Sequence, residues 1–423
     1  MPGPHGQVVP FAVLSASVVL AVSLLAHYYL YRRLARTLAL DGRPRRAALS
    51  VAVGLGILLP LTVGAGWLRP FGIARALGLG GSVWAGLILY GILLTGVVDL
   101  LRLASRVVRG AVGRAGLLRT RAISLGVDTV SRRSALGSIG AAGVALATGG
   151  AAAVGIREGL GDPEVTDVEV PLRGLRPGRA GGLVVAHLSD LHAGTVVRAA
   201  RVRRIADMVN GLRPDLVVLT GDIVDRYVDG AHEAVGELRR LDAPLGVWAC
   251  TGNHEYWGDV RLAGEWLSAA GVTTLRNRHV TIDTPCGPLD IVGVDDHWAT
   301  RIEEAGGARL DLAVAGRDAS VPAILLCHQP RDLAKADAAG IGLQLSGHLH
   351  GGQMFPFGLL QRLAYDHVCG LHRLGDCRIY VNRGLGTVGP PLRVAAPSEV
   401  ARIRLVPGGS PTVEARRRAP SRS

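Results

Sequence analysis

The 423-residue sequence has few aromatic residues (4%) and only five cysteines, none of which forms a C-x-x-C pair. Without such a pair, a zinc ribbon or a thioredoxin-type redox site is unsupported. Cys250 and Cys327 lie in apolar runs, which predicts buried thiols. Cys369 and Cys377 flank a predicted turn, so they could form a disulfide across a hairpin in an oxidising compartment.

Charge is absent from four long stretches near the N-terminus, which are Met1–Tyr31, Ala47–Leu68, Ala76–Val98 and Ser134–Ile156. A helix crosses the bilayer core in roughly 20 residues, so each stretch is long enough. Within residues 1–133 we expect three transmembrane helices, at about 8–31, 47–68 and 77–101. The fourth segment, 134–156, consists mostly of Ala and Gly. It is either a fourth transmembrane helix or an internal signal of the twin-arginine type, since Ser131-Arg132-Arg133 precedes it.

The net charge of +13 is carried almost wholly by arginine, and the arginines cluster after the first and third apolar stretches. The loop between the second and third stretches has only Arg69 and Arg75. Positively charged loops stay in the cytoplasm, so the N-terminus and everything after Ile156 are predicted to lie outside it, in a multi-pass protein of the cell membrane. Because the arginines act as topology signals, we expect no nucleic-acid partner.

The remainder of the chain is predicted to hold one domain. Residues 157–182, rich in Pro, Gly and Arg, resemble a linker, and residues 409–423 a disordered basic tail. Between them, over 183–408, short apolar runs first alternate with amphipathic helical patterns and then follow one another with fewer helices. This order predicts parallel strands covered by helices. We therefore expect an α/β fold with two sheets packed face to face and helices outside.

Polar residues of metal-binding type end five of the predicted strands, in the groups SDLH, GDIVD, GNHE, LLCHQP and SGHLHGG. Each group alone has an ordinary explanation, such as a turn or a helix N-cap. Five of them in order, each after an apolar run, are hard to obtain by chance, and open α/β sheets place their sites at this edge. The candidates are Asp190, His192, Asp222, Asp225, Asn253, His254, Glu255, His328, His348 and His350.

The composition of this set indicates its chemistry. Four histidines, carboxylates and an amide oxygen suit first-row divalent metals. Seven ligands are too many for one catalytic ion that keeps an open position. They suit two ions about 3.5–4 Å apart that share a carboxylate, bind a phosphate and activate a bridging water. No nucleophilic Ser or Cys is then needed.

The five groups resemble the five blocks of the calcineurin-like metallophosphoesterases, and more narrowly their membrane-attached or exported bacterial branch. In GHLHGGQ, Leu349 stands where that branch typically has Thr, which alters no ligand. The tail YVNRGLGTVGPPLR is similar too, so the resemblance covers roughly Leu183 to Leu405. It implies a calcineurin-like two-sheet sandwich flanked by helices, in four layers (α/β/β/α).

The resemblance also implies two divalent metal ions (Mn²⁺, Fe²⁺/Fe³⁺ or Zn²⁺) and a metal-bridged hydroxide that attacks phosphorus. His254 would assist the leaving group without binding metal, Asp225 would orient His254 or anchor its loop, and Glu255 would be structural. The implied ligands are Asp190, His192 and His350 for one ion, Asn253, His328 and His348 for the other, and Asp222 as the bridge.

We therefore predict a membrane-anchored phosphohydrolase whose site lies outside the cytoplasm, acting on a lipid-linked or membrane-proximal phosphoester. The alternative is a metal-binding sensor or regulatory membrane protein without turnover. His254 distinguishes the two, since a structural metal site has no use for a non-ligand histidine beside it. A transporter-like role for the helices is disfavoured, because they contain few charged residues.

Overall fold

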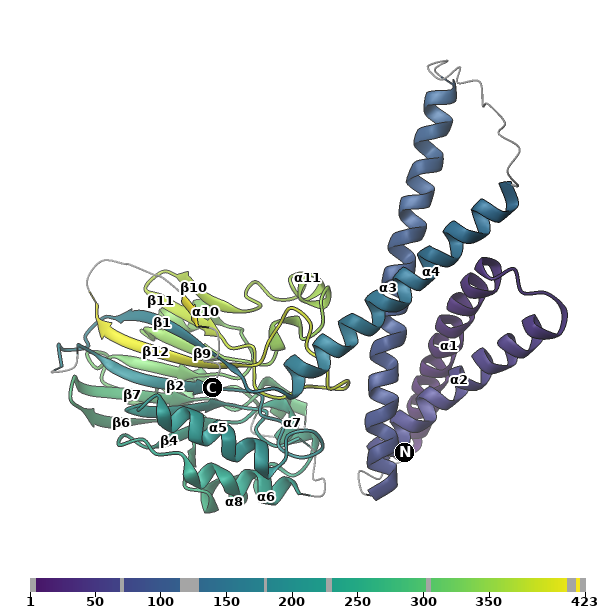
Figure 1. Cartoon of the computed structure of the whole chain (residues 1–423). Helices are drawn as coiled ribbons and strands as arrows, with labels where there is room; N and C mark the ends of the chain where they lie inside the picture. The colour runs from purple at the N-terminus through teal and green to yellow at the C-terminus, as the bar shows by residue number, and fades with distance from the viewer. Residues whose placement is uncertain are drawn as a thin grey trace. The chain divides into compact units, whose positions relative to one another are not determined.

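The structure is a computed structural model, and it describes residues 5–68, 72–114, 129–178, 181–225, 230–301, 306–408 and 416–418. The chain forms two compact units, Met1–Val154 and Gly155–Ser423. The first consists of helices and the second contains the sheets (Figure 1).

Long helices cover all four stretches that lack charge: α1 (His5–Thr37), α2 (Gly42–Leu68), α3 (Gly72–Arg114) and α4 (Thr129–Leu160). Among the described residues, three segments are long and apolar enough to cross a membrane, namely Gly42–Ala65, Gly72–Ala111 and Gly137–Leu160. The first 15 side chains, which include the start of the predicted helix 8–31, lie outside the described residues. So do the side chains of the Arg132–Arg133 pair.

Two groups of polar side chains inside the first unit are paired with one another. Trp84 Nε1 donates a hydrogen bond to His27 Nε2 at 3.1 Å. Asp99 accepts a hydrogen bond from the Tyr29 hydroxyl at 2.9 Å and forms an ion pair with Arg33. A bilayer provides no water for such groups, so internal pairing is what a membrane-spanning bundle needs.

The second unit contains two sheets. The strands of the first are β1 (Glu164–Leu172), β2 (Leu183–Leu188), β3 (Leu216–Thr220), β4 (Val247–Cys250), β5 (Val272–Thr274), β12 (Glu399–Pro407) and β13 (Arg416–Arg418), in the order β13-β1-β12-β2-β3-β4-β5. The strands of the second are β6 (Arg278–Thr284), β7 (Gly287–Gly293), β8 (Ala323–Leu326), β9 (Leu343–Ser346), β10 (Gly370–Leu374) and β11 (Cys377–Val381), in the order β10-β11-β9-β8-β7-β6. In each sheet the central strands run parallel: β2 to β5 in the first, and β7, β8, β9 and β11 in the second.

Short helices connect these strands. They are α5 (Ala199–Gly211), α6 (Ala231–Gly236), α7 (Asn253–Trp257), α8 (Val260–Ala269), α9 (Leu310–Ala313), α10 (Leu333–Ala338) and α11 (Phe357–Gln361), with 3-10 turns η1 (Glu237–Arg240), η2 (His297–Arg301) and η3 (His350–Gly352).

Alternate side chains of a strand point to opposite faces of its sheet, and β3 shows how this builds the layers. Leu216 and Val218 pack in the core between the two sheets. Val217 and Leu219 pack on the other face, against α5, α6 and α8. A third apolar cluster joins the outer face of the second sheet to α9 and α10. The domain therefore has the predicted four layers, α/β/β/α.

The segment 157–182, predicted to be a linker, contributes a strand instead. Val168, Val170 and Leu172 of β1 are buried, and β1 pairs along its length with β12 in parallel register. The Pro-, Gly- and Arg-rich residues on either side conceal this alternating run in the sequence. The predicted tail 409–423 lies outside the described residues, except for Arg416–Arg418, which forms β13 beside β1.

All five cysteines are free, so the disulfide considered for Cys369 and Cys377 is not formed. Cys377 belongs to the apolar cluster under α10, whereas Cys369 is exposed just before β10. The two thiols thus lie in different environments, which the spacing of a hairpin does not reveal. Cys250 and Cys327 are buried, as predicted.

Candidate metal centre

The predicted site residues follow the carboxyl ends of five strands, three in the first sheet and two in the second. Asp190 and His192 follow β2, Asp222 follows β3, Asn253 and His254 follow β4, His328 follows β8, and His348 and His350 follow β9. The structure brings them together at one edge of the sandwich, as contacts between their side chains show. Both sheets therefore supply ligand atoms to a single site.

Five of these residues have left-handed backbone conformations, with φ of 50° at Asp190, 47° at His192, 50° at Asp222, 72° at His348 and 51° at His350. Residues other than glycine adopt this region rarely, at a cost of about 1–3 kcal/mol each. The loops after β2, β3 and β9 therefore turn sharply, and the turns aim the side chains at the site. Nothing in the sequence indicated this strain.

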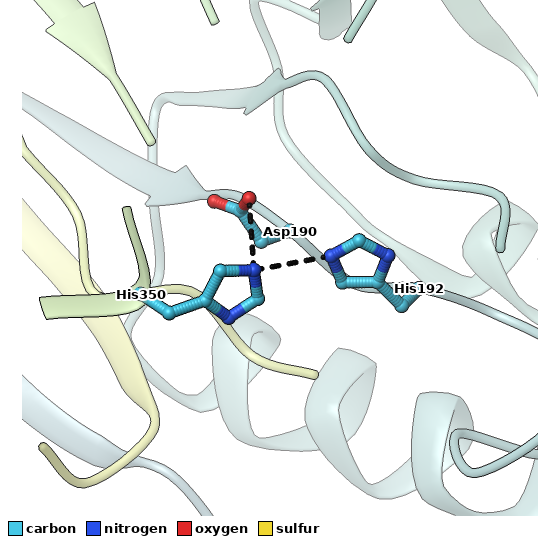
Figure 2. A group of neighbouring side chains, drawn as sticks. All are labelled: Asp190, His192 and His350. Atoms are coloured by element: carbon cyan, nitrogen blue, oxygen red, sulfur yellow. Dashed lines mark hydrogen bonds and ion pairs between the residues drawn. The ribbon is translucent and has the colours of Figure 1, made fainter. Parts of the chain in front are cut away.

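The first group of side chains comprises Asp190, His192 and His350 (Figure 2). The Nε2 atoms of the two histidines lie 3.2 Å apart, and His350 Nε2 lies 3.4 Å from Asp190 Oδ1. All three residues are buried. The backbone N–H of His348 donates to the Asp190 carboxylate at 3.0 Å, which fixes the carboxylate beside the two rings.

The second group surrounds His328. Its Nδ1 donates to the carbonyl of Thr220 at 2.7 Å, so the ring, when neutral, presents a bare Nε2. Burial opposes a charge on this ring, but the Asp222 carboxylate outweighs burial and holds the pKa of His328 well above its ordinary value. Three atoms lie 3.2 Å from that Nε2: Oδ2 of Asp222, Oδ1 of Asn253 and Nδ1 of His348. Such a convergence of lone pairs requires positive charge at its centre. A proton on Nε2 can form a hydrogen bond to only one of the three neighbours. A divalent cation can be bound by all three neighbours and by Nε2 itself.

Asp222 lies between the two groups. Its Oδ2 is 3.2 Å from His328 Nε2 and 3.8 Å from His192 Nε2. Its Oδ1 accepts the backbone N–H of His254 at 2.9 Å, so the carboxylate cannot rotate freely. A carboxylate held in this position is suited to bridge cations in the two groups.

Burial also sets the protonation of the candidate ligands. It lowers the pKa of His192 to about 3 and that of His348 to about 4. Burial and the Arg393 guanidinium hold the pKa of His350 well below its ordinary value. These three rings are therefore neutral at physiological pH, the state in which imidazole binds metals. Taken with the oxygens of Asp190, Asp222 and Asn253, this donor set fits first-row divalent ions.

His254 lies beside both groups. Its Nδ1 is 3.3 Å from Asp225 Oδ1, and its Nε2 is 3.9 Å from Asp222 Oδ2. Burial alone would lower the pKa of His254, but the two carboxylates outweigh it and raise the pKa above its ordinary value. Such a ring can carry a proton near neutral pH. His192, Asp225 and His254 also lie close enough together to share a cation.

Arg393 is a functional neighbour that the sequence analysis did not identify. It is fully buried, and its Nη2 donates to His350 Nδ1 at 3.2 Å and to the carbonyl of Gly384 at 3.0 Å. Burial lowers its pKa to about 9. If His350 bound an ion through Nε2, its Nδ1 would carry the hydrogen, and Arg393 would donate to carbonyls alone. Arg393 ends the GPPLR sequence. It lies far from His350 along the chain, so no local sequence pattern indicated that the two side chains are in contact.

Two further residues shape the loops. The Glu255 carboxylate accepts the backbone N–H groups of Asp222 at 3.0 Å, Val224 at 2.9 Å and Gly252 at 2.7 Å, so it joins the loops after β3 and β4. This is the structural role predicted for it. At Gly347 an added Cβ would collide with the side chains of Ser189 and Asp190, so only glycine fits there.

Comparison with known proteins identifies the family. The model for calcineurin-like phosphoesterases matches residues 183–352. An uncharacterised metallophosphoesterase of Helicobacter pylori strain J99 is 34% identical over 279 residues, which cover 66% of this chain and 73% of that protein. The chain belongs to the calcineurin-like phosphoesterase family. The matched block contains every residue predicted to bind metal.

Other relatives of this calcineurin-like phosphoesterase are named as transmembrane proteins. A zebrafish (Danio rerio) transmembrane protein with a metallophosphoesterase domain is 38% identical over 251 residues, and the match covers 57% of each chain. A solved dimetal phosphatase from the same species is 14% identical, with a TM-score of 0.34 over 50% of this chain and 90% of that one. With its apolar helices, this phosphoesterase is a membrane protein.

Proposed function

We propose that the protein is a membrane-anchored phosphohydrolase with a dinuclear metal centre. The observation that carries the proposal is the position of Asp222, which faces both the His192 group and the His328 group. The assigned ligands are Asp190, His192 and His350 for one ion, Asn253, His328 and His348 for the other, and Asp222 for both. Mn²⁺, Fe²⁺/Fe³⁺ and Zn²⁺ all suit these donors.

When bound, the two ions would supply Lewis acidity to the phosphoryl oxygens and acidify a water molecule. The chain's own residues supply the proton for the other half of the reaction. Asp225 holds His254 through Nδ1, which leaves Nε2 to donate a proton to the leaving oxygen as its bond to phosphorus breaks. The products are an alcohol and the remaining phosphate.

We infer that the substrate is a lipid-linked or membrane-proximal phosphoester and that the domain lies outside the cytoplasm. The anchor supports the first part, because a domain tied to apolar helices meets esters at the membrane surface before others. The arginine-rich loops after the first and third apolar stretches support the second part.

The test uses the full-length protein in detergent with bis-p-nitrophenyl phosphate and added Mn²⁺. We expect release of p-nitrophenol and two metal equivalents per chain. Asp222→Asn should remove at least one equivalent and nearly all turnover, whereas Asp311→Asn, on an exposed carboxylate outside the site, should change neither. Bound metal without turnover under any divalent ion would instead support the sensor alternative.

A further inference from the structure

An apolar surface follows directly after the last ligand turn, between Phe355 and Leu363. Leu363 is 86% exposed, and Phe355 and Leu360 are each 56% exposed. No residue of α11, which lies within this segment, is buried. Among the described residues of the second unit, half of the large apolar side chains that are exposed lie in this segment. They are Phe355, Phe357, Leu359, Leu360 and Leu363.

Hydrogen bonds hold this segment, here called the apolar ledge, in a defined position. The backbone N–H of Phe355 donates to the carbonyl of Val394 at 3.0 Å. The Gln361 amide donates to the carbonyl of Leu349 at 3.1 Å, which ties the ledge to the turn between His348 and His350. A patch of this kind, fixed in place and facing solvent, marks a surface that contacts something apolar.

The ledge borders the metal centre. Tyr365, just beyond its end, has its ring centroid 6.0 Å from that of His348. The guanidinium of Arg331, which is exposed, lies 4.6 Å from the centre of the Tyr365 ring. Arg362 within the ledge is exposed as well. Apolar side chains next to exposed arginines match the boundary between acyl chains and anionic headgroups.

The end of an apolar helix lies next to the ledge and indicates which structure the ledge contacts. The span Gly137–Leu160 is long and apolar enough to cross a membrane, and its last turns belong to the second unit. There the carbonyl of Gly155 accepts the backbone N–H of Arg393 at 2.8 Å. The next residue, Val394, bonds to both Gln353 and Phe355. A single loop thus joins the end of a membrane-crossing helix to the start of the ledge.

We propose that the apolar ledge inserts into the interfacial layer of the membrane that anchors the chain, and that it turns the mouth of the metal centre toward the lipid headgroups. The occupant of the surface is the bilayer. The insertion itself does not depend on the proposed function. A consequence for the substrate, that the site acts on phosphoesters of amphiphiles embedded in that bilayer, rests on the proposed function.

The insertion is tested by lipid contact, with no reference to catalysis. In a Cys369→Ser background, which removes the exposed cysteine, Leu363→Cys is labelled with an environment-sensitive fluorophore. The full-length protein is placed in vesicles of phosphatidylcholine and phosphatidylglycerol, some with acyl chains carrying a nitroxide quencher. Leu312→Cys is the matched control, since Leu312 is 51% exposed on α9, in another part of the domain.

We expect the label at position 363 to lose at least about half of its fluorescence in quencher vesicles, and the label at 312 to keep nearly all of it. Equal quenching at both positions, or none at 363, overturns the proposal. In the second case a protein partner or a second copy of the chain would cover the ledge instead.

A second measurement tests the consequence for the substrate. It compares two esters that release the same leaving group, p-nitrophenol. Leu360→Asp/Leu363→Asp should lower turnover of phosphatidyl-p-nitrophenol in vesicles about tenfold and leave turnover of soluble bis-p-nitrophenyl phosphate unchanged. Equal rates for variant and wild type on the vesicle substrate overturn the assigned substrate class. A wild type that hydrolyses neither ester overturns the proposed function, while the quenching result still decides insertion.

Discussion

At the scale of single residues, His254 separates catalysis from metal binding. Its ring touches the site through Nε2 and is held by Asp225 through Nδ1. Loss of a general acid typically lowers turnover by about 10²–10⁴-fold. We therefore expect His254→Gln to lower kcat for bis-p-nitrophenyl phosphate in that range while the metal content, measured by atomic emission, stays at the wild-type value. A variant that lost metal in proportion to activity would make His254 a ligand.

His187 gives the fold a predictable sensitivity to acid. The ring is buried on β2 with Nε2 2.8 Å from the Thr220 hydroxyl, while its Nδ1 has no hydrogen-bond partner among the described residues. Burial lowers its pKa to about 3, against about 6.5 in an unfolded chain. Between those values the unfolded chain binds more protons than the folded one, so the stability due to this residue is present above pH 6.5 and falls as the pH falls toward 3.

The corresponding variant is His187→Gln, compared with wild type by urea denaturation in detergent at several pH values. A single group whose pKa differs between the folded and unfolded chain changes the free energy of unfolding by up to about 1.4 kcal/mol per pH unit. We expect the free energy of unfolding of wild type to fall more steeply between pH 6 and pH 4 than that of the variant, by up to that amount. Parallel pH profiles would show that His187 does not account for the sensitivity.

At the scale of elements, a buried polar cluster joins the two sheets. The hydroxyl of Tyr380 on β11 donates to Glu399 on β12 at 2.5 Å, and Arg383 Nε donates to the same carboxylate at 3.1 Å. Burial opposes ionisation of Glu399, but Arg383 and the Tyr380 hydroxyl outweigh it, so that its pKa lies below the ordinary value. The cluster therefore contains a buried ion pair that spans the sandwich.

Removing one partner of such a pair leaves the other charge buried, at a cost of about 3–5 kcal/mol. We expect Glu399→Ala to lower the free energy of unfolding by that amount in urea denaturation. Tyr380→Phe removes one hydrogen bond and should cost about 1–2 kcal/mol. If both variants were as stable as wild type, the cluster would not hold the sheets together.

The elements also show what sequence patterns can predict. Short apolar runs such as the one ending before Asp190 predicted strands that the structure contains, and the polar groups after them lie together, because the carboxyl ends of parallel strands meet at one edge of a sheet. β1 was missed because its alternation lies between Pro- and Gly-rich residues. The contact of Arg393 with His350, and the left-handed turns at the ligands, arise only when distant segments meet.

At the scale of the whole molecule, the side of the membrane on which the domain lies can be measured with one thiol. Cys369 is exposed, and the other four cysteines are buried. In spheroplasts that produce the full-length protein, we expect a membrane-impermeant maleimide to label the wild type and not Cys369→Ser. Labelling that appears only after permeabilisation would place the domain in the cytoplasm and contradict the topology drawn from the arginines.

The pairing of β1 with β12 has a mechanical consequence. β1 begins at Glu164, shortly after α4 ends at Leu160, and it lies parallel to β12 from Glu164 to Leu172. A pull transmitted through α4 would load β1 lengthwise. The hydrogen bonds of that ladder would then bear the load in shear and together, whereas a strand pulled sideways loses its bonds one after another. Tension on the anchor should therefore be resisted before it reaches the loops that carry Asp190 and Asp222.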